Sequence, residues 1–280
     1  MINIIADSLC GIPGSERPKL GIPFISQFII IDGKSYRDTT EIDTPTFLKK
    51  LKAAKELPKT AAPLPEDYIP LFRKLAQKGD TAIVITPSKE MSGTYHAAWV
   101  AKQEFPDLDI RLVDTRTIAG SLGSIVLQAL YWVKAGWDAD QIVNGVISMA
   151  HRERIFFLVD TLEYMQKGGR IGGAAALIGT ILRIKPILTL HDGQVEVYEK
   201  IRTKSAAINR LKELVETGCP KKPEAWLSVS HCSALETATE LANSFKKTLG
   251  FKYVPIYEVP PAIVVNSGPN VLGVGFFADE

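Results

Sequence analysis

Short apolar runs alternate along the chain with longer amphipathic segments, and this alternation limits the possible folds more than any other feature. Ile2–Ala6, Thr81–Thr86 and Ile110–Val113 are each short and apolar and are followed by polar residues, as is typical of buried strands. Pro65–Lys78 and Ala119–Ala135 have the length and spacing of helices. Because parallel strands are joined by helical crossovers, the pattern predicts an α/β protein.

Asp32-Gly33, flanked by Ile22–Ile31 and Lys34–Tyr36, is a strong hairpin signal in the first half of the chain, but the second half is richer in predicted hairpins. His191-Asp192-Gly193 separates two apolar runs, and Ala262–Asn266 is expected to form a later strand. We therefore predict two α/β domains with a boundary near residue 160. Residues 1–160 are expected to form a largely parallel sheet flanked by helices, and residues 161–280 an α/β domain with a mixed or antiparallel sheet.

The composition excludes several classes of protein. Of the 280 residues, 46% are hydrophobic, which is too many for a disordered chain. The 33 basic and 31 acidic residues leave a net charge of only +2, which is no large basic excess for binding nucleic acid. The longest apolar stretches fall short of the roughly 20 residues that span a bilayer, so no stable membrane insertion is expected. Three separated cysteines and an N-terminus without a signal-peptide pattern favour the reducing cytoplasm.

Polar residues follow several predicted strands, at the edge where parallel α/β sheets bind ligands. Asp7, Asp114 and His231 occupy such positions. An aspartate there can ligate a metal or act in catalysis, but it more often caps a helix or ties a loop, and no cluster of ligating residues accompanies these three, so we expect no metal. A phosphotransferase or dihydroxyacetone-kinase-like enzyme acting through His231 or Asp114 is the alternative function, although the chain has no nucleotide-binding motif.

Three other segments are candidate anion sites, each with a structural alternative. Ser92-Gly93 precedes a predicted helix, where a hydroxyl and free N–H groups can bind an anion, or where Ser92 can act only as an N-cap. Thr60 lies in a proline-bracketed extended loop that can also be a simple linker. Arg170 follows Gly168-Gly169 at a helix end, where it can clamp a carboxylate or satisfy the last helical carbonyls.

These segments occur in a fixed order with several others. The ordered set comprises Asp7-Ser8, Pro58-Lys59-Thr60 with Pro63, Met91-Ser92-Gly93-Thr94-Tyr95, Val113-Asp114-Thr115, Asp160–Tyr164, Lys167–Ile171, Lys185–Leu188, Arg202-Thr203 and Gly268-Pro269. It resembles the DegV family of bacterial fatty-acid-binding proteins, over essentially the whole chain. Each segment is short, but the ordered set is specific.

The resemblance implies a two-domain DegV-like fold with one long-chain fatty acid in a tunnel between the domains. It assigns the fatty acid carboxylate to Thr60, Ser92, Gly93 and Asn266, and it places Arg170 near the head group or facing a partner. The implied partner is a fatty acid kinase, which makes an acyl-phosphate from the chain that the protein presents. The protein is then a cytoplasmic lipid-binding protein of phospholipid metabolism that needs no cofactor, and it is not itself an enzyme.

The chain departs from the family pattern at two positions. Ala61 stands where a serine often follows the threonine, and Asn266 stands where a histidine usually precedes the Gly-Pro. Asparagine can donate an amide hydrogen bond to a carboxylate, but it cannot carry charge. The head-group site therefore has less tunable electrostatics, and coupling to a kinase is the property most affected.

A fatty acid also needs an apolar channel, because each buried methylene contributes about 0.8 kcal/mol. Apolar residues near or beyond the predicted boundary either line this channel or belong to the core, and the stretch Ala174–Leu182 is expected to be helical. The candidates for lining are Ile155, Phe157, Leu177, Ile178, Ile181 and Val264.

Overall fold

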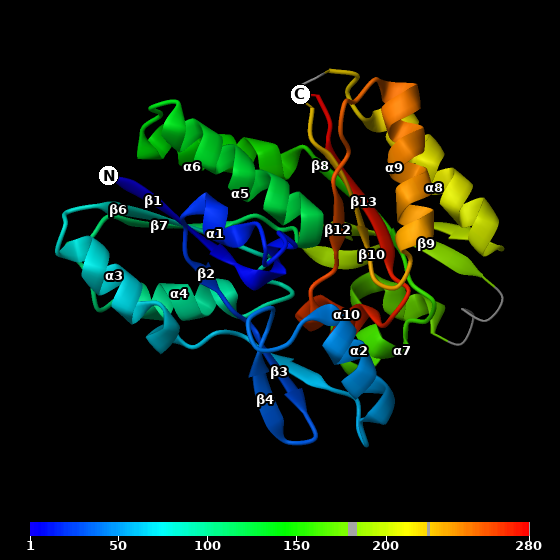
Figure 1. Cartoon of the computed structure of the whole chain (residues 1–280), viewed down its shortest axis with the longest axis horizontal. Coiled ribbons are helices and arrows are strands. Elements are labelled where there is room, and N and C mark those ends of the chain that lie inside the picture. Colours follow the sequence, from blue (N-terminus) through cyan, green and yellow to red (C-terminus); the bar gives the residue numbers. More distant parts are fainter. Residues whose placement is uncertain (179–183, 223–224, 280) are drawn as a thin grey trace.

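A wholly parallel sheet organises the first half of the protein in the computed structural model, which describes residues 1–178, 184–222 and 225–279. Its strand order is β2-β1-β6-β7, and helices cover both faces (Figure 1). The strands are β1 (Ile2–Asp7), β2 (Phe24–Ile25), β6 (Thr81–Thr86) and β7 (Ile110–Asp114). The helices are α3 (Ile69–Ala76) and α4 (Thr94–Lys102) on one face, and α5 (Ala119–Lys134) and α6 (Ala139–His151) on the other.

Side chains alternate between the two faces along each buried strand, and this explains why helices pack on both faces of the parallel sheet. Ile4 packs in the core cluster that contains α5 and α6, whereas its neighbour Ile5 packs in the cluster with α3 and α4. Successive side chains of a strand point to opposite faces, so a short continuous apolar run serves both. The prediction of a parallel sheet flanked by helices is confirmed.

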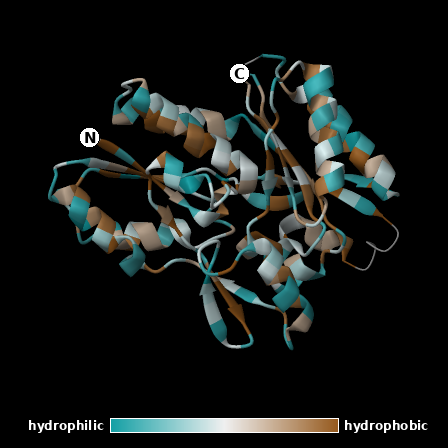
Figure 2. Cartoon of the chain, viewed as in Figure 1, coloured by the Kyte–Doolittle hydropathy of each residue, from teal (hydrophilic) through white to brown (hydrophobic). Residues whose placement is uncertain are grey.

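The second sheet is mixed and has six strands in the order β10-β9-β8-β13-β11-β12. Only β11 and β12 pair in parallel. α8 (Lys204–Gly218) and α9 (Leu235–Leu249) cover one face, with their hydrophilic sides turned outward (Figure 2). The strands are β8 (Glu153–Leu158), β9 (Lys185–His191), β10 (Gln194–Ile201), β11 (Leu227–His231), β12 (Ile256–Glu258) and β13 (Leu272–Phe277).

A small antiparallel sheet, β4-β3-β5, lies beside these two sheets. The predicted hairpin at Asp32-Gly33 joins β3 (Phe28–Ile31) to β4 (Lys34–Arg37). β5 (Lys59–Ala61) pairs with β3 and carries Thr60. The remaining helices are α1 (Arg17–Leu20), α2 (Thr44–Ala53), α7 (Glu163–Lys167) and α10 (Pro261–Ser267), with 3-10 turns η1 (Ser8–Cys10), η2 (Pro65–Asp67) and η3 (Gly172–Leu177).

The expected strand at Ala262–Asn266 is wrong, because this segment lies in helix α10. Ile263, Val264 and Val265 have strand propensity, but Pro260 and Pro261 precede them. A proline at the first helical position has the fixed φ that a helix needs there, and Asp38 accepts a hydrogen bond from the backbone N–H of Ala262. Tertiary context thus overrides the propensity of three β-branched residues.

Two other sequence expectations meet the structure differently. Ala174–Leu177 lies in the 3-10 turn η3 and not in an α-helix, Ile178 follows that turn, and residues 179–182 lie outside the described residues. β8 precedes the predicted boundary at residue 160, yet it hydrogen-bonds to β9 and β13 of the second sheet. Within the described residues, no helix is both long and apolar enough to cross a bilayer.

Helix α5 lies between the two large sheets and contacts both β1 and the pair β11 and β13. Glycine makes this close approach possible. A side chain at Gly123 would collide with the Cys10 carbonyl oxygen, and a Cβ at Gly120 would come within 2.6 Å of the Ser228 hydroxyl. The helix is therefore shared by both halves of the molecule.

A buried carboxyl group joins segments that are distant in sequence. Asp38 Oδ2 accepts a hydrogen bond from Ser8 Oγ at 2.7 Å, and Oδ1 accepts one from the Ala262 N–H at 3.3 Å. Nearby, Thr44 Oγ1 donates to the Val259 carbonyl at 2.9 Å. These bonds hold α10 against the first half of the chain.

Burial raises the pKa of Asp38 from 3.8 to about 7, because desolvation outweighs its hydrogen bonds to Ser8 and Ala262. The folded protein therefore holds a proton that the unfolded chain releases, and the free energy of unfolding decreases as pH rises through this interval. In Asp38→Asn this loss should be smaller by on the order of 2 kcal/mol between about pH 5 and 8. Chemical denaturation at several pH values measures it.

The exposed Asp107 provides the matched control, and Asp107→Asn should keep the wild-type pH dependence. An Asp38→Asn profile parallel to that of the wild type would contradict the proposed proton uptake by Asp38.

Candidate functional site

A cavity of about 1020 Å³, which includes space open to solvent, lies between the first half of the chain and the second sheet. Leu9 and Gln27 line it from the first half, while β8, β11, β13 and α10 contribute the opposite walls. Both halves of the chain therefore contribute to one cavity.

Most of the residues that the sequence singled out line this cavity, although they come from five separate segments. They are Thr60, Ser92, Gly93, Arg170, Asn266, Ile155 and Phe157.

Three of the expected lining residues lie elsewhere, and a fourth is outside the described residues. Leu177 and Val264 are buried in the main hydrophobic core and are not part of the cavity wall. Ile178 is 45% exposed, and Ile181 lies outside the described residues. Val264 is displaced because α10 is a helix: Ala262, Ile263 and Asn266 face the cavity, and Val264 does not.

Ser92 belongs to a hydrogen-bond network at the start of α4. Its hydroxyl lies 2.9 Å from Thr94 Oγ1, accepts a bond from the Thr94 N–H at 3.3 Å and donates to Gln27 Oε1 at 3.4 Å. Gly93, not Ser92, is the N-cap residue of α4. Ser92 therefore lies on the cavity wall with its hydroxyl oriented by neighbouring polar groups.

Asp7 lies behind this network. Its Oδ2 accepts hydrogen bonds from Gln27 Nε2 at 2.6 Å and from Thr94 Oγ1 at 3.0 Å, and its Oδ1 caps η1 by accepting from the Leu9 N–H at 2.7 Å. Burial raises the pKa of Asp7 to about 6, although these bonds and the charge of Arg17 oppose the rise. Two hydrogen bonds thus separate Ser92 from a carboxyl group that titrates near neutrality.

Arg170 and Asn266 both lie beside the turn at Gly168. The Arg170 guanidinium donates to the Met91 carbonyl at 3.2 Å and to the Gly168 carbonyl at 2.6 Å. A side chain at Gly168 would collide with Asn266 Oδ1, so a larger residue there would require the Asn266 side chain to move. The arginine forms no ion pair with the residues that the structure describes, and carbonyl oxygens hold its positive charge beside the cavity.

The Thr60 side chain comes from β5, where its residue pairs with Ile29 of β3. Gly93 packs against Ala62, the residue that follows β5, because a Cβ on Gly93 would lie 3.1 Å from the Ala62 methyl group. Thr60, Ala62, Ser92 and Gly93 therefore share one part of the wall.

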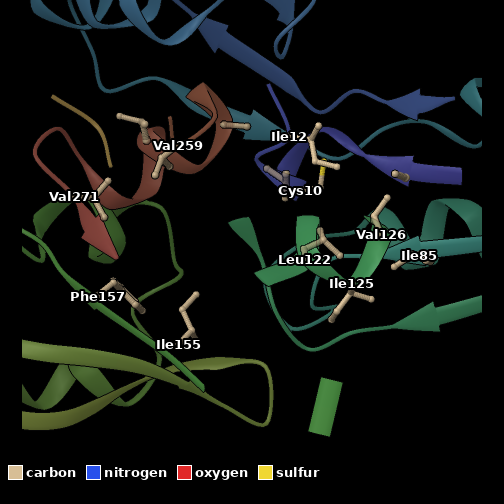
Figure 3. Packing of buried hydrophobic residues seen from close by; sticks show 14 of the residues in the cluster. Cys10, Ile12, Ile85, Leu122, Ile125, Val126, Ile155, Phe157, Val259 and Val271 are labelled. Carbon is tan, nitrogen blue, oxygen red and sulfur yellow. The ribbon is translucent and has the colours of Figure 1, made fainter. Parts of the chain in front are cut away.

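The second sheet contributes an apolar wall from β8. Ile155 lies across from Gly275 and Phe157 across from Gly273 on β13, so glycine leaves space above each pair. Ile155 and Phe157 lie on the same side of the core view as Val259 and Val271, whereas Leu122 lies beneath Cys10 on the other side (Figure 3). This wall offers hydrocarbon contacts without charge.

Two residues of this region were missed from the sequence. Gln27 lies within the run Ile22–Ile31, but the structure divides this run into β2 and β3, which are separated by Ser26-Gln27. Two polar residues inside an apolar run were the available signal. Asp38 carried no such signal, because its partners are distant in the chain.

Asp114 and His231 are not part of the cavity wall. Asp114 Oδ1 accepts hydrogen bonds from the N–H groups of Lys89 and Arg116, so it ties the loops after two strands. His231 is buried at the end of β11, where burial lowers its pKa and its Nδ1 has no partner among the described residues. In the same described ranges, no three His, Cys, Asp or Glu residues group as metal ligands.

Comparison with known proteins gives consistent matches along the chain. A model of the DegV family, described as uncharacterised proteins, matches residues 1–279. A DegV domain-containing protein of Streptomyces coelicolor is 34% identical over 275 residues, which cover 98% of this chain and 97% of that protein.

Solved structures match equally well. A DegV family protein from Thermus thermophilus, described for its fatty acid binding, superposes with a TM-score of 0.90 at 26% identity and covers 99% of both chains. A fatty acid binding DegV family protein from Streptococcus agalactiae gives a TM-score of 0.89 at 29% identity, covering 100% of this chain and 99% of that one. The sequence and the fold agree, and the chain belongs to the DegV family.

Proposed function

We propose that this protein binds one long-chain fatty acid in the cavity between its two halves and is a binding protein rather than a catalyst. The observation that carries the proposal is a large cavity that combines apolar walls with a few hydroxyl, amide and guanidinium groups. The described fatty acid binding of the relatives from Thermus thermophilus and Streptococcus agalactiae supports it.

The polar groups suit a carboxylate head group. Thr60, Ser92 and the Gly93 N–H supply donors from one part of the wall, and Asn266 and Arg170 supply them from another. Arg170 is already held by two carbonyls and adds positive charge nearby. Hydrogen bonds to a charged group are stronger than bonds between neutral partners, so few are needed.

The apolar walls suit an acyl chain. Leu9, Ile155, Phe157, Met165 and Ile263 present hydrocarbon to the cavity. At about 0.8 kcal/mol for each buried methylene, a long chain supplies most of the binding free energy. Affinity then depends on chain length, and the head-group contacts fix orientation.

Replacing Ser92 tests the head-group assignment. Ser92→Ala removes one hydrogen bond to a charged carboxylate, worth about 1.5–3 kcal/mol, and should weaken binding of hexadecanoic acid by about 10–100-fold. Titration calorimetry with delipidated protein measures this effect. Ser35→Ala, on the exposed strand β4, should bind as the wild type does, and equal affinities for all three proteins would refute the assignment.

The protonation of Asp7 should make binding depend on pH. Once ionised above about pH 6, this buried carboxylate lies two hydrogen bonds from Ser92, and so three from the proposed position of the ligand carboxylate, which it repels. Binding of an ionised fatty acid should therefore tighten several-fold as pH falls from about 8 to 6. The same titrations with Asp7→Asn should give a flatter profile, and equal slopes would exclude Asp7 as the cause.

We further propose that the protein presents the bound acid to a fatty acid kinase for acyl-phosphate formation, as a cytoplasmic component of phospholipid metabolism. Arg170 beside the cavity is the residue assigned to this encounter. With a fatty acid kinase and ATP, the loaded protein should yield an acyl-phosphate, and Arg170→Ala should lower the yield by at least about tenfold, more than it lowers occupancy. Arg73→Ala, on the exposed side of α3, is the control, and a yield insensitive to Arg170 would contradict this role.

A further inference from the structure

Part of the cavity wall outside the proposed head-group residues is polar. Ser121 of α5 and Ser228 and Ser230 of β11 all line the cavity. They are buried, with exposed fractions of only 1%, 1% and 9%. We call these three residues the serine wall.

Sheet register places the serine wall along the cavity. Ser230 of β11 pairs with Gly273 of β13, which in turn pairs with Phe157 of β8, and these three residues form the Ser230 row. Ser228, Gly275 and Ile155 form the Ser228 row in the same way. β13 begins shortly after Asn266, and each residue advances a strand by about 3.3 Å. The Ser228 row is therefore about 7 Å farther from the start of β13 than the Ser230 row.

Glycines hold the hydroxyls of the serine wall close together. A Cβ at Gly120 would lie 2.6 Å from Ser228 Oγ and 2.9 Å from Ser230 Oγ, and a side chain at Gly275 would collide with Ser121 Oγ. Because these positions lack side chains, the three hydroxyls converge across the contact between α5 and the second sheet.

The hydroxyls of the serine wall have unused hydrogen-bonding capacity. Ser121 Oγ is buried without a hydrogen-bond partner in the described chain, and none is found there for the side chains of Ser228 and Ser230 either. Glu153 lies behind Ser121; burial raises the pKa of Glu153 to about 7, and the nearby Ser121 and Thr117 hydroxyls oppose this rise. Thr117 donates to Glu153 at 2.8 Å, whereas Ser121 makes no bond of normal geometry to it.

A plain hydrocarbon chain would leave these hydroxyls desolvated and unpaired, which is unfavourable. A hydroxyl group on the chain would pair with them, because a serine hydroxyl both donates and accepts. No charged side chain is part of the serine wall, so it does not suit a second carboxylate.

We propose that the cavity is selective for long-chain fatty acids with a hydroxyl group on the part of the chain remote from the carboxylate, and that Ser121, Ser228 and Ser230 bind this hydroxyl. The inference rests on the proposed fatty acid binding and adds the class of acid that is preferred.

Competitive binding to delipidated full-length protein tests the inference. The probes are hexadecanoic acid, its ω-hydroxy derivative and its α-hydroxy derivative, whose hydroxyl lies beside the head group. The ω-hydroxy acid should bind at least about tenfold more tightly than hexadecanoic acid, whereas the α-hydroxy acid should gain nothing from the serine wall.

Variants identify the residues responsible. In Ser228→Ala and in Ser121→Ala the ratio of the two dissociation constants should fall toward one, while Ser35→Ala should keep the wild-type ratio. Thermal melting of each variant establishes that it is folded. A wild-type ratio near one, or a ratio unchanged in both serine variants, overturns the inference.

The outcomes separate the two proposals. If hexadecanoic acid binds in a Ser92-dependent manner without preference for the ω-hydroxy acid, fatty acid binding stands and the serine wall has no such role. If none of the three acids binds, both proposals fail.

Discussion

The close approach of α5 to both large sheets is the constraint on which the rest of the structure depends. Gly123 allows η1 to pack on the helix, and Gly120 allows the serines of β11 to do so. α5 thereby follows the strands of the parallel sheet along the chain but also packs against the mixed sheet. The space that its small residues leave against β8, β11 and β13 becomes the cavity, so the same contact joins the halves and forms the site.

Two carboxyl groups buried in this part of the protein are held by hydrogen bonds to side-chain and backbone groups. Asp7 and Asp38 bond to Gln27, Ser8 and Ala262, and desolvation raises the pKa of both carboxyls toward neutrality. A carboxyl that is readily protonated is less costly to bury than a fixed charge. The head-group region can thus be buried and polar, and the charge that opposes a bound carboxylate is smallest when Asp7 is protonated.

Much of the fold could be predicted from the sequence because local patterns determine it. The apolar run of β6 and the turn at Asp32-Gly33 form as expected, since strand periodicity and turn chemistry act over a few residues. The segment Ala262–Asn266 could not be predicted in this way. Its β-branched residues favour a strand, whereas two prolines and the distant Asp38 hold a helix.

The sequence by itself determined the α/β class, the family and the identity of the candidate residues, because these follow from periodicity and from ordered motifs along the chain. Only the tertiary structure decided which of these residues share a cavity. Thr60, Ser92, Arg170 and Asn266 come from different segments, and Val264 is excluded by the turn of its helix. Gln27, Asp38 and the serine wall likewise acquire their relation to the site through packing, since residues far apart in the chain become neighbours only when the two halves close around α5.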